Sequence, residues 1–197
     1  MRTATRVSLA LLALAAATTP ARGQVELVGL EKVHQFYTSD QRRAAAYELN
    51  LVSVQFRNEI GRCRDEQIGA RMIELEPKID ALIKRLNAGT VTSAAILERE
   101  FVVIDRLLAE NHQQLAASGW STRRTGSVLG VAADLSLSAR YVVRAAGWTH
   151  EQLPADVQKA VDDALALSKR LSADPTNPPS ETPAVIEALG KAIKAGR

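Results

Sequence analysis

The sequence predicts an all-α protein: a single bundle-like domain of four to five main helices that follows a cleaved signal peptide and carries a short tail helix. Three observations favour this fold class. The chain is rich in Ala, Leu, Arg and Glu, and only 4% of its residues are aromatic, which suits helices better than sheets. Apolar residues recur at intervals of three, four and seven, the spacing of one buried helix face. About 174 residues remain after the signal peptide, enough for one domain with its own core.

Residues 1–23 have the three parts of a secretory signal peptide. Two arginines give a cationic start, and an apolar stretch over residues 7–17 follows that is too short to span a bilayer. After a Thr-Thr-Pro break, residues 21–23 (Ala-Arg-Gly) place small residues at the −3 and −1 positions of a cleavage site. We therefore expect an exported protein, periplasmic or secreted, whose mature chain begins at Gln24. The alternative is an uncleaved anchor or a buried core helix.

The basic character of the whole chain belongs to this signal peptide. The chain has 25 Lys and Arg against 22 Asp and Glu, but Arg2, Arg6 and Arg22 lie within residues 1–23, which contain no acid. Removing these three arginines leaves 22 charges of each sign in the mature chain. Nucleic-acid binding needs a persistent basic face. The composition therefore argues against a nucleic-acid partner.

The first half of the mature chain is expected to be helical. A short apolar segment over residues 25–37 precedes a long helix over residues 41–67, and the long helix has one buried face formed by Ala45, Leu49, Val52, Phe56 and Cys63. A strand over residues 47–57 is the alternative, because Val52, Val54 and Phe56 also alternate along the chain.

Proline and glycine predict where the next helix begins and ends. A proline inside a helix removes a backbone hydrogen bond, so Pro77 predicts a break near Glu76 and a new helix over residues 77–87. Gly89 is placed to end that helix in the left-handed conformation.

Two further helices are predicted, one from Thr92 to Gly119 and one over residues 125–146. Gly119 and Gly147 each precede a tryptophan, so we expect each glycine to end a helix and the tryptophan to fold back onto the last turn. A ligand site shared by the two tryptophans is the alternative. The spacing of Gly126 and Gly130 predicts close packing of the second of these helices inside the bundle.

The C-terminal part of the chain divides at a proline-rich segment. Pro154 suits the first turn of a helix that ends before Asp174. Residues 174–183, DPTNPPSETP, read as an extended linker. We therefore divide the chain into a signal peptide, a helical domain, a linker and an amphipathic tail helix, with bounds 1–23, 24–173, 174–183 and 184–197.

The three histidines are the first candidates for a site. Glu31 and His34 form a Glu-x-x-His pair, which a helix places on one face, so these two residues are candidate metal ligands. A di-iron bundle needs a second such pair, and the sequence has none. His112 is expected to be solvated and His150 to lie at a helix start.

The single Cys63 excludes haem attachment through a Cys-x-x-Cys-His motif and cysteine-rich zinc sites. We expect its thiol to be buried beside Phe56.

The expected function is that of a non-enzymatic binding or accessory protein of the cell envelope, with another envelope protein as its partner. No motif predicts catalytic residues or a cofactor. The first alternative is a helical bundle that binds a metal or small ligand through Glu31 and His34, joined by His112 or His150. A hydrolase that uses converging carboxylates is a second alternative. Membrane-surface contact through residues 123–144, where arginines flank an apolar run, is a third.

Overall fold

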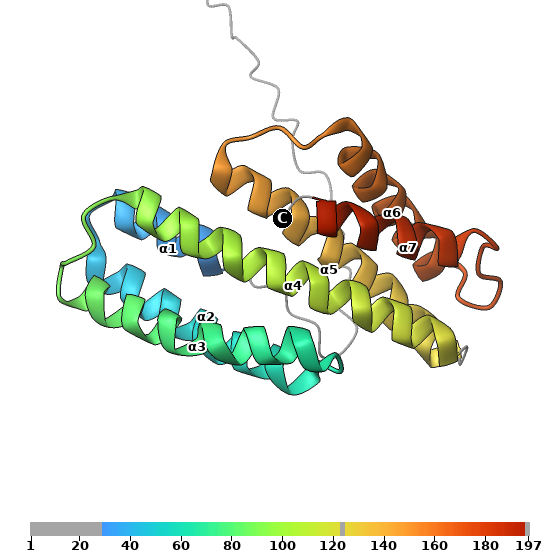
Figure 1. Ribbon diagram of the computed structural model, residues 1–197, viewed down its shortest axis with the longest axis horizontal. Helices are drawn as coiled ribbons and strands as arrows, with labels where there is room; N and C mark the ends of the chain where they lie inside the picture. The colour runs from blue at the N-terminus through green and yellow to red at the C-terminus, as the bar shows by residue number, and fades with distance from the viewer. Residues whose placement is uncertain (1–28, 123–124, 196–197) are drawn as a thin grey trace, which may run out of the picture.

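The computed structural model describes residues 29–122 and 125–195, with the backbone alone at positions 125 and 126. The predicted signal peptide lies outside the described residues. Within them the protein is all-helical and has no strand, which confirms the predicted class (Figure 1). The helices are α1 (Gly29–Thr38), α2 (Arg42–Arg62), α3 (Glu66–Asn87), α4 (Ala94–Thr122), α5 (Thr125–Thr149), α6 (Ala155–Ala173) and α7 (Thr182–Ala195).

The longest helix, α4, runs through the middle of the molecule. It packs against α1 and α3 on one side and against α5 and α7 on the other (Figure 1). The N-terminal helices α1, α2 and α3 also pack on one another in chain order, as do the C-terminal helices α5, α6 and α7. One helix therefore links two groups of helices, and side chains between these groups hold the bundle together.

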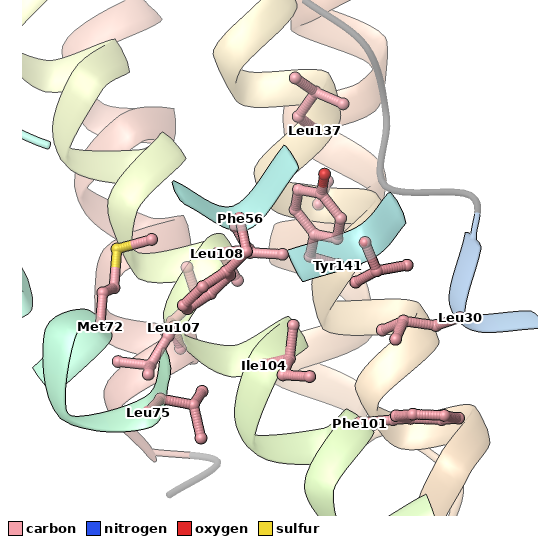
Figure 2. Packing of buried hydrophobic residues seen from close by; sticks show 14 of the residues in the cluster. Leu30, Phe56, Met72, Leu75, Phe101, Ile104, Leu107, Leu108, Leu137 and Tyr141 are labelled. Atoms are coloured by element: carbon pink, nitrogen blue, oxygen red, sulfur yellow. The ribbon is translucent and has the colours of Figure 1, made fainter. Parts of the chain in front are cut away.

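The core lies where five of the helices meet. Figure 2 shows Leu30 from α1, Phe56 from α2 and Met72 from α3 gathered around α4 and α5, and each of these three side chains is buried. The predicted stripe of α2 is correct for Ala45, Leu49, Val52 and Phe56, all of which are buried. Val54 is 48% exposed, as a helix requires and an alternating strand does not, so the strand alternative over residues 47–57 is wrong.

The predicted break at Pro77 is also wrong, because α3 continues through this proline. The chain breaks at residues 63–65 instead, where Cys63 ends α2 and the Asp65 carboxylate caps α3 by accepting hydrogen bonds from two backbone N–H groups. Pro77 lies on the exposed side of α3. Buried side chains both before and after it, such as Leu75 and Ile79, hold the helix on the core, so packing outweighs the local effect of the proline.

The glycine predictions have different outcomes. Gly89 has a left-handed φ of 68° and ends α3 as expected. Gly119 and Gly147 do not end helices, because α4 continues to Thr122 and α5 to Thr149. His150, with φ 57°, takes the left-handed position after α5. Gly119 instead allows a close approach between helices, since a Cβ atom there would lie 3.1 Å from a methyl group of Val131 on α5.

The tail helix α7 packs on the domain. Ile186, Leu189 and Ile193 face α4 and α6 and are nearly fully buried. The side-chain amide of Gln113 on α4 donates to the backbone carbonyl of Ile186 at 3.0 Å. In the described part of the chain, no helix combines the length and the apolar character that crossing a bilayer requires.

Candidate functional site

The predicted metal ligands Glu31 and His34 have separate partners. His34 Nε2 lies 2.9 Å from Glu98 Oε1 on α4, whereas Glu31 Oε1 lies 3.5 Å from the guanidinium of Arg144 on α5. His150 approaches the other oxygen of Glu98, at 3.9 Å. Among the described residues, no three or more His, Cys, Asp or Glu side chains are grouped so as to hold a metal ion. The metal site at Glu31 and His34 stays a prediction of the sequence.

A buried carboxylate lies close to this position. Asp105 on α4 is fully buried and accepts two hydrogen bonds from Arg144, from Nε at 2.9 Å and from Nη2 at 2.6 Å. The indole Nε1 of Trp148 donates a third, at 2.9 Å. We call Asp105, Arg144 and Trp148 the aspartate cluster. Trp148 is therefore a hydrogen-bond donor within α5 rather than a plug after its end.

Burial and pairing shift the pKa of both charged groups in the aspartate cluster, Asp105 and Arg144. Burial raises the pKa of the Asp105 carboxyl, while the hydrogen bonds from Arg144 and Trp148 act in the opposite direction. Burial alone would lower the pKa of Arg144, but the hydrogen bond and charge of Asp105 outweigh it and raise that pKa. Each charge thus depends on the other for its stability in the core.

A second buried cluster surrounds His112, which we expected to be solvated. The expectation is wrong, because His112 is 0% exposed. Its Nδ1 lies 2.8 Å from Asp134 Oδ1 on α5, and its Nε2 lies 3.5 Å from Glu59 Oε2 on α2 without forming a hydrogen bond. The guanidinium of Arg62 contacts both carboxylates, at 2.8 Å from Glu59 and 3.5 Å from Asp134. We call Glu59, Arg62, His112 and Asp134 the histidine cluster.

Tyr141 lies between the two clusters. Its ring stacks on His112 at a centroid distance of 5.6 Å, and the guanidinium of Arg144 lies 5.0 Å from the same ring. Figure 2 shows this ring among apolar core side chains that include Phe56 and Leu108. The two clusters therefore form one continuous set of contacts through the middle of the bundle.

These contacts connect the N-terminal helices to α4 and α5. Glu31 on α1 contacts Arg144, and Arg62 on α2 contacts Asp134. In addition, Arg71 on α3 pairs with the buried carboxylate of Glu110 on α4 at 2.6 Å. Buried ion pairs contribute little net stability but penalise arrangements that separate the partners. The clusters can therefore fix how the two groups of helices fit together. Within them, His112 and Asp105 are fully buried and have no access to solvent.

Cys63 differs from its expected position. It is half-buried at the end of α2, on the edge of the core, and its thiol donates to the backbone carbonyl of Asp65 at 3.3 Å. Burial raises the pKa of the thiol. The thiolate, which is the reactive form, is therefore disfavoured at neutral pH.

The arginines of the predicted membrane-contact region, residues 123–144, have different environments within the described residues. Positions 123 and 124 lie outside the described residues, Arg140 is exposed, and Arg144 forms hydrogen bonds with Asp105.

Trp120, the other tryptophan predicted to close a helix end, lines a cavity together with prolines of the 174–183 segment, Pro175 and Pro178 among them.

One side of α2 carries three exposed apolar side chains. Tyr47, Leu51 and Val54 follow one another at intervals of four and three residues, so they lie on one side of the helix. Their exposed fractions are 64%, 41% and 48%. We call these three side chains the α2 face.

Comparison of the chain with protein-family models, curated proteins and solved structures gives no match.

Proposed function

We propose that the protein is exported to the periplasm or secreted and acts there as a non-enzymatic binding or accessory protein of the cell envelope. The observation that carries this proposal is the α2 face. Single exposed apolar residues are ordinary on a protein surface. Three large ones at helical spacing form a continuous stripe of the kind that packs against an amphipathic helix of a partner. Tyrosine at the end of such a stripe also suits an interface, because it combines apolar area with a polar tip.

The non-enzymatic part of the proposal is supported by what surrounds the acid–base groups. Two of the acid–base groups, His112 and Asp105, are fully buried and bonded to other helices. A general acid or base must reach the proton that it transfers. These groups instead hold the bundle together, which suits a rigid binding protein.

We also assign the bundle five main helices, α2 to α6, which range from 19 to 29 residues, with shorter helices at either end. In the proposed protein this bundle follows a signal peptide that is removed after residue 23. The cationic start, short apolar stretch and small residues of residues 1–23 support removal at that position.

Processing is tested by expressing the full chain with its own N-terminus in a bacterial host. We expect the protein outside the cytoplasm, with an intact mass that lacks residues 1–23. As a control, replacing Leu11 and Leu12 by Arg should interrupt the apolar stretch and keep the unprocessed chain in the cytoplasm. An unprocessed wild-type chain in the cytoplasm would contradict the proposal.

The binding face is tested by site-specific photo-crosslinking in cells that naturally produce the protein. A photo-reactive amino acid at position 51 should give one discrete adduct, whereas the same group at the exposed Lys169 on α6 should give none. The substitution V54E should remove the adduct without lowering the melting temperature, because Val54 is half exposed. Equal adduct yields at positions 51 and 169 would contradict a specific face, and an adduct with twice the chain mass would identify the partner as a second copy.

A further inference from the structure

A small cavity opens between the C-terminal helices and α4. Its volume is about 170 Å³, and α4, α5, α6, α7 and the connection between α5 and α6 all contribute to its wall. Val142, Leu153, Val157 and Ile193 are the larger apolar side chains of this wall. An apolar cavity of about 150 Å³ is large enough for a benzene-sized ligand. The space therefore suits a molecule with an apolar body of about six carbon atoms.

Alanines create this space. Ala109 on α4, Ala145 and Ala146 on α5 and Ala192 on α7 all line the cavity, where larger side chains would fill it. The apolar walls of a cavity that stays open lack contact partners on one side. A bound ligand would restore the missing contacts.

The charge at the cavity distinguishes one class of ligand. Arg106 on α4 lines the cavity and is half-buried, and it has no hydrogen-bond or ion-pair partner within the described ranges. By contrast, Arg71 on α3 and Arg144 on α5 each pair with a carboxylate of α4. A guanidinium presents its donors in a fork that matches a carboxylate. Arg106 thus lacks the partner that a carboxylate ligand would supply.

One acidic group also lines the cavity. Glu151, in the connection between α5 and α6, is exposed and forms no ion pair with Arg106. Its charge is screened by water and salt more strongly than that of the half-buried Arg106. The charge that a ligand meets within the cavity is therefore mainly positive.

From this geometry we propose that the cavity binds a small monocarboxylate whose apolar body, about six carbons long, lies against Val142, Val157 and Ile193 while its carboxylate pairs with Arg106. The site is separate from the α2 face, and the proposal does not rest on the proposed function. The ligand fills the open cavity and supplies the carboxylate that Arg106 lacks.

Binding is tested by isothermal titration calorimetry on the purified mature chain with three probes that share one body: hexanoate, hexan-1-ol and hexylamine. We expect hexanoate to bind at least tenfold more tightly than either of the others. R106Q should weaken hexanoate at least tenfold and leave hexan-1-ol unchanged. The matched control R99Q, an exposed arginine two turns earlier on α4, should bind hexanoate like the wild type.

The size of the site is tested by A146L, which adds volume at a half-buried position of the cavity wall. It should abolish binding of both hexanoate and hexan-1-ol while the melting temperature stays near that of the wild type. A146V serves the same purpose with less added volume if the larger side chain disturbs folding. Failure of hexanoate to bind at millimolar concentration, equal binding of hexylamine, or full affinity in R106Q would each overturn the proposal.

Discussion

Deletion of residues 175–197 should destabilise the protein by about 4 kcal/mol or more. Ile186, Leu189 and Ile193 are nearly fully buried against α4 and α6, and burying each such side chain contributes roughly 1.5–3 kcal/mol. The deletion also leaves the buried amide of Gln113 without the carbonyl of Ile186. Part of this loss is offset because the deleted residues no longer need to be ordered. Urea denaturation followed by circular dichroism measures the difference.

Two point variants show whether the loss comes from docking of α7. L189A should cost roughly 2–5 kcal/mol, because it opens a cavity beneath the helix. E187A on the exposed side of α7 breaks only an ion pair with Lys191 and should leave the urea midpoint nearly unchanged. If the truncated protein kept the wild-type midpoint, α7 would be a detachable element rather than part of the core.

The sequence predicts the buried side of a helix more reliably than the residue at which the helix ends. The apolar stripe of α2 marks the buried face correctly, because helical spacing alone decides which side chains share a side. Pro77 and Gly119 are misleading because they act on the local backbone, whereas burial along a whole helix involves many more contacts. A chain break at residues 63–65 was still visible in Asp65, a capping residue directly before a helical stripe.

The clusters could be predicted in part. On α4, Asp105 and His112 stand in register with Phe101 and Leu108, at intervals of four, three and four residues. Polar residues in an apolar stripe are expected to be buried and paired, so this spacing is the signal that we missed. The spacing does not identify the partners of Asp105 and His112. Arg144, Asp134 and Glu59 lie on other helices, and pairing across helices depends on how the helices are placed relative to one another.

The aspartate cluster gives the prediction with the largest effect for a single side chain. D105A should destabilise the protein by roughly 3–5 kcal/mol, because it removes the buried counter-charge of the Arg144 guanidinium and the acceptor of the Trp148 indole. The measurement is again urea denaturation. K159A, which breaks the exposed pair with Asp163 on α6, is the matched control and should change the urea midpoint little.

A double variant separates the stability of the cluster from its role in positioning. In D105L/R144M, both charges are replaced by apolar side chains of similar size, and most of the lost stability should return, because the desolvation of two ions no longer has to be offset. The part that does not return reflects the indole of Trp148, which still lacks its acceptor. If the double variant were as unstable as D105A, the pair itself would be a net source of stability. Recovery of stability would mean that the charges serve mainly to fix the fit between helices. The loss of Arg144 also removes its contact with Glu31 on α1, so hydrogen exchange in α1 should then be faster in the double variant although its global stability is restored.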